Sequence, residues 1–179
     1  IEEDSLNKLY QDINLFYDLN INLYPGEFCS ITSSTNEKSK IILFNTSSGI
    51  KRADTYKNKN LSSFYPKDLK QMMYFNMLDE ESFEVIVSLG AAGTGKTTIA
   101  MAKAAERLFK EKKKIYLCKP TLMVQSHENH VFGPVPGDVN EKYAPYISSF
   151  EIVLSKVLGS KAKSYVEAMF QKKKIEFIP

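Results

Sequence analysis

The amino-acid sequence predicts an α/β fold, in which a small β-rich module precedes the partial core of a doubly wound parallel sheet. From Tyr65 onward, short apolar strand-like segments alternate with segments whose apolar residues recur at helical spacing. Strands that alternate with helices form parallel sheets with helices on both faces. The chain is 43% hydrophobic and 25% charged, which is typical of globular proteins. We expect two parts, residues 1–64 and residues 65–179.

Charge, cysteine content and the N-terminus exclude several protein classes. The net charge of the 179 residues is +3, which does not by itself indicate a nucleic-acid-binding protein, although a local basic patch stays possible. Cys29 and Cys118 are too few for a disulfide framework, and their apolar surroundings predict reduced, buried thiols. The acidic start Ile1–Asp4 is unlike a signal peptide, which favours the cytoplasm. Because it lacks an initiator Met, we expect a fragment or a processed product.

Residues 1–64 predict short elements without obvious chemistry. A brief helix is expected around Leu6–Tyr10. Tyr24–Gly26 reads as a turn, because Pro25 presets φ and Gly26 accepts positive φ. Phe28–Thr32 and Ile41–Phe44 look like a pair of strands. The polar and basic segment Lys51–Lys59 is expected to be a linker.

Residues 65–179 predict alternating helices and strands. A helix can start at Pro66–Asp68 and present Leu69, Met72, Met73 and Leu78 on one side. Glu84–Leu89 is apolar on both faces, as a buried parallel strand is. The elements expected after it are a helix over Thr97–Lys110, a buried strand over Lys114–Cys118, a loop over Thr121–Pro136, helices over Pro145–Leu158 and Lys161–Lys172, and a strand over Ile175–Ile178.

The segment Gly90–Thr97 is a complete G-x-x-x-x-G-K-T motif between a predicted strand and a predicted helix. Its glycines let the backbone turn so that successive N–H groups surround a polyphosphate, and the helix N-terminus attracts the same anion. Lys96 is expected to reach the β- and γ-phosphates, and the Thr97 hydroxyl to coordinate Mg²⁺. A Gly-rich turn with a chance Lys-Thr is the alternative. The predicted nucleotide-binding residues here are Gly90, Ala91, Ala92, Gly93, Thr94, Gly95, Lys96, Thr97 and Thr98.

Hydrolysis is a separate question from nucleotide binding. It requires a carboxylate that holds Mg²⁺ and a group that orients water, and these usually come from a later strand ending in Asp-Glu. Asp79–Glu80 follows an apolar run, but it precedes the loop and ends a helical segment, so we do not assign it this role. After Thr97, no apolar strand ending in Asp-Glu occurs before Pro179. We therefore expect the chain to end before that segment.

Four blocks in order make the chain resemble the PhoH-like ATPases. The first is Gly90–Thr97 with its Ala-rich helix, and the second is Lys114–Pro120, where Lys119 stands in place of an Arg. The third is Gly133–Asp138 followed by Glu141-Lys142 and Pro145-Tyr146, which is similar to the family's GFLPGD…EK…PY signature. The fourth is Lys174–Pro179, which looks like the strand before the family's Arg-Gly-Arg and Asp-Glu segment.

The resemblance extends toward the N-terminus and has functional implications. Leu23–Phe28 resembles a segment of longer members, in which a PIN ribonuclease domain and a β-rich linker precede the ATPase. Gln71 resembles the adenine-recognising Gln of the family. The resemblance implies ATP and Mg²⁺ as cofactors, RNA or single-stranded nucleic acid as partner, helicase activity and a homo-oligomeric ring. The loop over residues 121–132 departs from the family, because Gln125–His130 replaces a Gly-containing segment.

Weaker signals keep other functions open. His127 and His130 could be metal ligands, but a solvated or nucleotide-proximal loop explains them as well. The basic clusters Lys110–Lys114 and Lys172–Lys174 read as solvated turns or as contacts to nucleic-acid phosphates. Asp138 fits a turn as well as a site. A nucleotide-binding structural or assembly module without hydrolysis is the alternative function, and a phosphotransferase is a third.

Overall fold

The computed structural model describes residues 1–54, 65–118, 151–152, 154–155 and 162–178. These residues form two compact units. The described part of the first unit comprises residues 1–54 and 65–96, and that of the second comprises residues 97–118, 151–152, 154–155 and 162–178. The boundary expected after residue 64 stays a prediction. Among the helices of these residues, none combines the length and the apolar composition that a membrane crossing requires.

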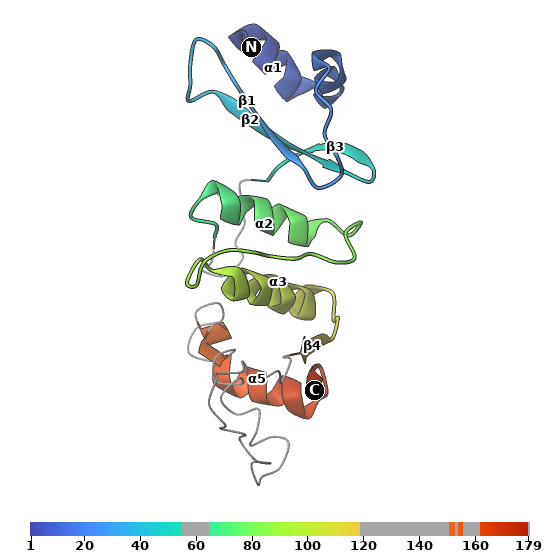
Figure 1. The fold of residues 1–179 in the computed structure, drawn as a ribbon. Coiled ribbons are helices and arrows are strands. Elements are labelled where there is room, and N and C mark those ends of the chain that lie inside the picture. Colours follow the sequence, from blue (N-terminus) through green and yellow to red (C-terminus); the bar gives the residue numbers. More distant parts are fainter. Residues whose placement is uncertain (55–64, 119–150, 153, 156–161, 179) are drawn as a thin grey trace, which may run out of the picture. The chain divides into compact units, whose positions relative to one another are not determined.

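The first unit contains a three-stranded antiparallel sheet with the order β1-β2-β3 (Figure 1). The strands are β1 (Phe28–Thr32), β2 (Lys40–Thr46) and β3 (Gly49–Arg52). The expected turn is confirmed, since Gly26 has a φ of 89° and Glu27 N donates to Tyr24 O over 2.9 Å. The strand over Phe28–Thr32 is confirmed, and the second strand is longer than expected. The linker expected over Lys51–Lys59 is corrected at its start, because Lys51 and Arg52 belong to β3; the polar side chains of these two residues concealed the strand.

Two short helices cover the sheet with apolar side chains. α1 (Glu3–Gln11) confirms the expected N-terminal helix, and the 3-10 helix η1 (Ile13–Leu19) follows it. Asp12 starts η1, because its carboxylate accepts a hydrogen bond from Asn14 N. The buried core of this module joins the helices to β1 and β2 and consists of Leu6, Leu9, Phe16, Ile31, Ile41 and Leu43.

α2 (Leu69–Asp79) confirms the helix expected after Pro66–Asp68. Asp68 caps it by accepting a hydrogen bond from Gln71 N over 2.8 Å. The buried Asn76 uses its side-chain amide to accept from Asp54 N and to donate to Asp54 O. It also donates to Met72 O, so this amide ties α2 to the residues that follow β3.

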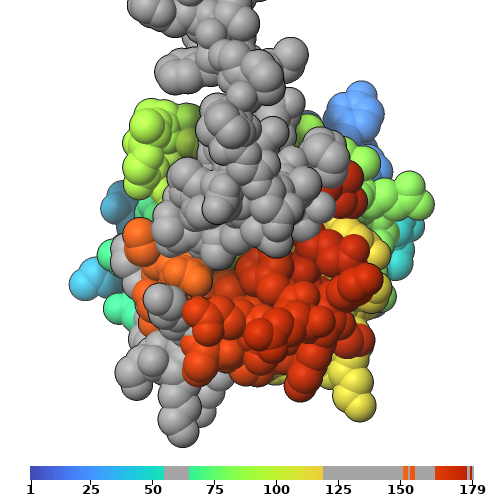
Figure 2. All heavy atoms as spheres, turned by 90° about the horizontal axis from the view of Figure 1, so that it is seen from below, coloured from blue at the N-terminus to red at the C-terminus, as the bar shows by residue number. Residues whose placement is uncertain are grey.

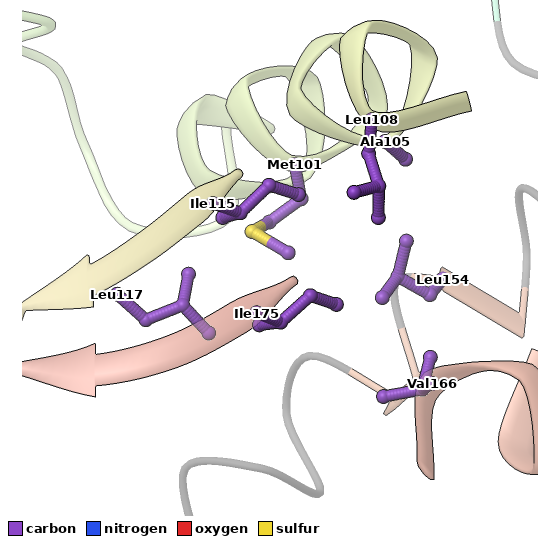
Figure 3. Close-up of a cluster of buried hydrophobic side chains, with 8 residues drawn as sticks. All are labelled: Met101, Ala105, Leu108, Ile115, Leu117, Leu154, Val166 and Ile175. Atoms are coloured by element: carbon purple, nitrogen blue, oxygen red, sulfur yellow. The ribbon is translucent and has the colours of Figure 1, made fainter. Parts of the chain in front are cut away.

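The second unit contains a parallel pair of strands covered by helices. α3 (Lys96–Lys110) precedes β4 (Ile115–Cys118), and α5 (Ala162–Gln171) precedes β5 (Ile175–Ile178). The two strands pair in parallel, as expected, with Ile115 opposite Ile175. In Figure 3 the labelled side chains of α3, β4, β5 and α5 point toward one another. They form a buried hydrophobic cluster that consists of Met101, Ala105, Leu108, Ile115, Leu117, Leu154, Val166 and Ile175. In Figure 2, residues of the C-terminal segment that includes α5 and β5 are drawn in red.

Three expectations from the sequence are corrected. Glu84–Leu89 forms no strand, and its Val85, Val87 and Leu89 side chains are 82%, 75% and 89% exposed. An extended segment becomes a strand only with a hydrogen-bonded neighbour, and none of the described strands pairs with it. The strand β4 was expected to be buried, but it is buried on one face only. Both cysteines were expected to be buried, but Cys118 is exposed and Cys29 is partly buried; both are free thiols.

Some expected elements lie outside the described residues. These are the loop over Thr121–Pro136 and most of the helix over Pro145–Leu158, of which residues 151–152 and 154–155 are helical.

Candidate phosphate-binding site

The loop Gly90–Gly95 leads directly into α3, which begins at Lys96. Gly93 and Gly95 have φ values of 78° and 92°, a region that L side chains rarely adopt, so the glycines of the motif permit this path. A Cβ placed on Gly90 would come within 3.4 Å of Thr94 Oγ1. The sequence thus produces a tight backbone curve that ends at a helix N-terminus.

Lys96 spans this curve. Its Nζ donates to Gly90 O over 2.8 Å and to Ala91 O over 2.7 Å, and it lies 3.4 Å from Thr94 Oγ1. The Thr94 hydroxyl also links two parts of the loop, because it donates a hydrogen bond to Ala91 O over 2.9 Å. Within the part of the chain that the structure describes, no carboxylate forms an ion pair with Lys96. The described carboxylates therefore leave the Lys96 ammonium charge unpaired at the loop, which suits an anionic ligand.

The remaining motif residues lie on the loop and in the first turn of α3. Ala91 and Ala92 are exposed on the loop, and Thr97 and Thr98 lie in the first turn of α3. Thr97 is exposed, so its hydroxyl is accessible to a ligand. The described residues include no group of three or more His, Cys, Asp or Glu side chains that could hold a metal ion. The exposed Thr97 hydroxyl is an oxygen ligand of the kind that Mg²⁺ takes beside phosphate oxygens.

Gln71 lies at the edge of the loop. Its Nε2 donates to Thr94 O over 3.2 Å, and its Oε1 accepts from Lys67 N over 2.9 Å. The structure thus brings Gln71 together with the motif, although they are more than 18 residues apart in the sequence. The role of Lys67 N was not predicted from the sequence, because a backbone donor leaves no residue-type signal.

Other candidates are placed differently or are not described. Glu80, which was not assigned a metal role, binds Lys51 Nζ over 2.7 Å. This hydrogen bond lowers the pKa of Glu80 below its ordinary value and outweighs the opposing effect of burial. His127, His130 and Asp138 lie outside the described residues.

The basic clusters are turns at helix ends. In the first cluster, Lys110 pairs with Glu106, Lys113 with Glu111 and Lys114 with Glu176. The second cluster follows α5, and its Lys172 and Lys173 are exposed. Three of the four lysines of the first cluster thus pair with carboxylates, although Glu106 is shared with Lys103, so the charge of this cluster is partly compensated.

The sequence profile of the family described as PhoH-like protein matches residues 63–179. The match covers more than half of the chain and includes the whole loop and Gln71. The chain belongs to the PhoH-like family. This is a family of P-loop NTPases of the ATPase type, which agrees with the geometry of Lys96 and the loop.

Individual PhoH-like relatives support the assignment. The chain is 36% identical over 109 residues to Protein PhoH of Escherichia coli K12, covering 60% of this chain and 29% of that protein. It is 39% identical over 83 residues to the PhoH-like protein of Mycobacterium tuberculosis H37Rv, covering 46% and 22%. It is 32% identical over 124 residues to the PhoH-like protein of Bacillus subtilis 168, covering 69% and 36%. The chain thus spans little more than a third of these relatives at most. No solved structure matches the chain significantly.

Proposed function

We propose that this PhoH-like chain binds ATP together with Mg²⁺ at residues 90–98. The observation that carries the proposal is the Lys96 ammonium, which spans the curved loop and has no carboxylate partner in the described structure. Lys96 would neutralise charge on the β- and γ-phosphates, and the loop N–H groups would donate to the same oxygens. Thr97 would hold Mg²⁺, which screens phosphate charge when it is bound.

We extend the proposal from nucleotide binding to nucleotide turnover by the protein. It would hydrolyse ATP and couple turnover to the binding and unwinding of RNA or another single-stranded nucleic acid. A ring of identical subunits in the cytoplasm and a doubly wound parallel core belong to the same proposal. Support comes from the family and from the motif, and Gln71 would contact the adenine from its place beside Thr94.

A binding measurement tests the nucleotide site directly. Titration of the chain with ATP and Mg²⁺ is expected to show saturable binding, and Lys96→Ala is expected to weaken it roughly 10- to 100-fold, the effect of losing a charged donor. Lys38→Ala, an exposed residue of the β1–β2 connection, is the control and is expected to bind as the parent chain does. Equal affinity in all three proteins would show that the loop is not the site.

A turnover measurement separates the proposed motor from the alternative. RNA-stimulated phosphate release by the full-length protein, abolished in Lys96→Ala, supports an ATP-driven motor. Tight ATP binding without phosphate release, with or without RNA, supports a nucleotide-binding assembly module. Transfer of the γ-phosphate to a small acceptor would identify a phosphotransferase.

A further inference from the structure

Both polar atoms of the Gln71 side-chain amide are hydrogen-bonded to backbone groups. Asp68 fixes Gln71 N in the first turn of α2, Lys67 N donates to Oε1 over 2.9 Å, and Nε2 donates to Thr94 O over 3.2 Å. The two ends of the amide have opposite polarity, so the Lys67 N–H selects the orientation in which the NH₂ group faces Thr94. The donor to the loop is therefore oriented by Lys67 N, just before α2, in the absence of a ligand.

The Thr94 carbonyl shares a peptide group with Gly95 N–H. Described peptide bonds are all trans, and in a planar trans peptide the C=O and N–H bonds point in opposite directions. A hydrogen bond that holds Thr94 O toward Gln71 therefore holds Gly95 N–H away from it. Loop N–H groups are the donors with which this motif binds phosphate.

The peptide between Thr94 and Gly95 needs such a restraint. Gly95 has a φ of 92°, and glycine adopts positive and negative φ about equally, so rotation of this peptide meets little resistance at Gly95. Lys96 and the Thr94 hydroxyl hold the carbonyls of Gly90 and Ala91, at the other end of the loop. These contacts do not involve the carbonyl of Thr94, whereas Gln71 binds it and so restrains the Thr94–Gly95 peptide.

We propose, building on the nucleotide site described above, that Gln71 is a positioning residue for phosphate: it fixes the Thr94–Gly95 peptide so that Gly95 N–H donates to the polyphosphate. This role is separate from any contact with adenine. The second N–H of the NH₂ group and the second lone pair of Oε1 still serve a base. A positioning residue aids every polyphosphate ligand, including one without a base.

The test uses tripolyphosphate, which has no base, beside ATP, both with Mg²⁺. Gln71→Met keeps the length and neutrality of the side chain but removes the donor to Thr94 O. It is expected to weaken tripolyphosphate about 3- to 10-fold, the effect of one hydrogen bond, and ATP by at least that factor, because ATP also loses the contact with its base. Gln71→Ala is the second variant should Gln71→Met not fold. Gln11→Met, an exposed residue at the end of α1, is the control and is expected to change neither affinity.

The amide resonance of Gly95 gives an independent readout. Addition of tripolyphosphate to the parent chain is expected to shift this resonance strongly, and the shift is expected to shrink in Gln71→Met at ligand saturation. If Gln71→Met weakens ATP but leaves tripolyphosphate and the Gly95 shift unchanged, Gln71 contacts only the base and the inference is overturned. If the parent chain binds neither ligand, the proposed nucleotide site itself fails, a result distinct from the first.

Discussion

At the scale of single residues, polar side chains form hydrogen bonds between distant segments of the chain, and the hydrophobic pattern of the sequence does not predict these bonds. Asn76 reads in the sequence as one more position of a helix, yet it is buried and hydrogen-bonded to Asp54 and Met72. A buried amide is tolerated only with such partners, because an unpaired polar group loses its hydration without compensation. The residue type of Lys96 and its spacing from the glycines predicted its place in the loop. The partners of Asn76 and Gln71 are backbone groups, and these carry no sequence signal.

Glu106 gives a prediction at the same scale. It accepts from Lys103 over 2.9 Å and from Lys110 over 2.7 Å. Burial alone would raise the pKa of Glu106, but the hydrogen bonds and charges of Lys110 and Lys103 outweigh it and hold the pKa below the ordinary value of 4.5. A lowered folded-state pKa stabilises the fold above the ordinary value, and this contribution is lost as the pH falls through the folded-state pKa.

We therefore expect the free energy of unfolding to decrease as the pH falls below 4.5, and Glu106→Gln to remove part of this decrease. At pH 7 the same substitution is expected to cost roughly 1–3 kcal/mol, because it weakens charged hydrogen bonds to a buried ammonium. Urea denaturation from pH 7 to pH 3 measures both effects. Glu167→Gln, an exposed residue of α5, is the control. Parallel pH curves for the parent and Glu106→Gln would show that Glu106 makes no such contribution.

At the scale of elements, the described α-helices were predictable from composition and spacing, whereas the 3-10 helix η1 and the strand β3 were not. Asp68 marks the start of α2, and the Ala-rich run marks α3, so both lie within a residue or so of their expected bounds. Val85, Val87 and Leu89 have the composition of a strand, but strand formation depends on a partner elsewhere in the chain. For the same reason β3 escaped prediction, because its pairing with β2 compensates for a polar sequence.

The end of α5 provides a prediction about an element. Lys173 has a φ of 52°, Lys173 N donates to Phe170 O, and Lys174 N donates to Met169 O, which together form a helix C-cap in which glycine is preferred. Lys173→Gly removes the strain of a left-handed residue, about 1–2 kcal/mol, but increases the entropy of the unfolded chain. We expect a net stabilisation of about 0.5–1 kcal/mol in urea denaturation.

The neighbouring lysine is the matched control. Lys172 is exposed and lies outside the left-handed region, so Lys172→Gly brings only the entropic cost and is expected to destabilise by about 0.5–1 kcal/mol. Opposite signs for the two substitutions would identify the backbone conformation as the cause. A destabilising Lys173→Gly would contradict the strain that the φ angle implies.

At the scale of the whole molecule, the proposed ligand is expected to act on stability. A ligand that binds only the folded chain stabilises it by RT ln(1 + [L]/Kd), about 2.7 kcal/mol at a ligand concentration of 100 Kd. For a chain of this length that corresponds to a rise in Tm of about 5–10 °C. The loop holds Lys96 and the glycines in a formed curve, so binding requires little reordering that would reduce the effect.

Thermal denaturation with ADP and Mg²⁺ measures this rise. Lys96→Ala is expected to unfold at about the parent Tm without ligand, since it removes contacts of an exposed loop, and to gain little when ligand is added. Gln71→Met is expected to keep a reduced rise, because one of several phosphate donors is lost. A graded series, largest in the parent, smaller in Gln71→Met and smallest in Lys96→Ala, is expected if both residues act on the same bound nucleotide. An equal rise in all three proteins would mean that the stabilising ligand binds elsewhere.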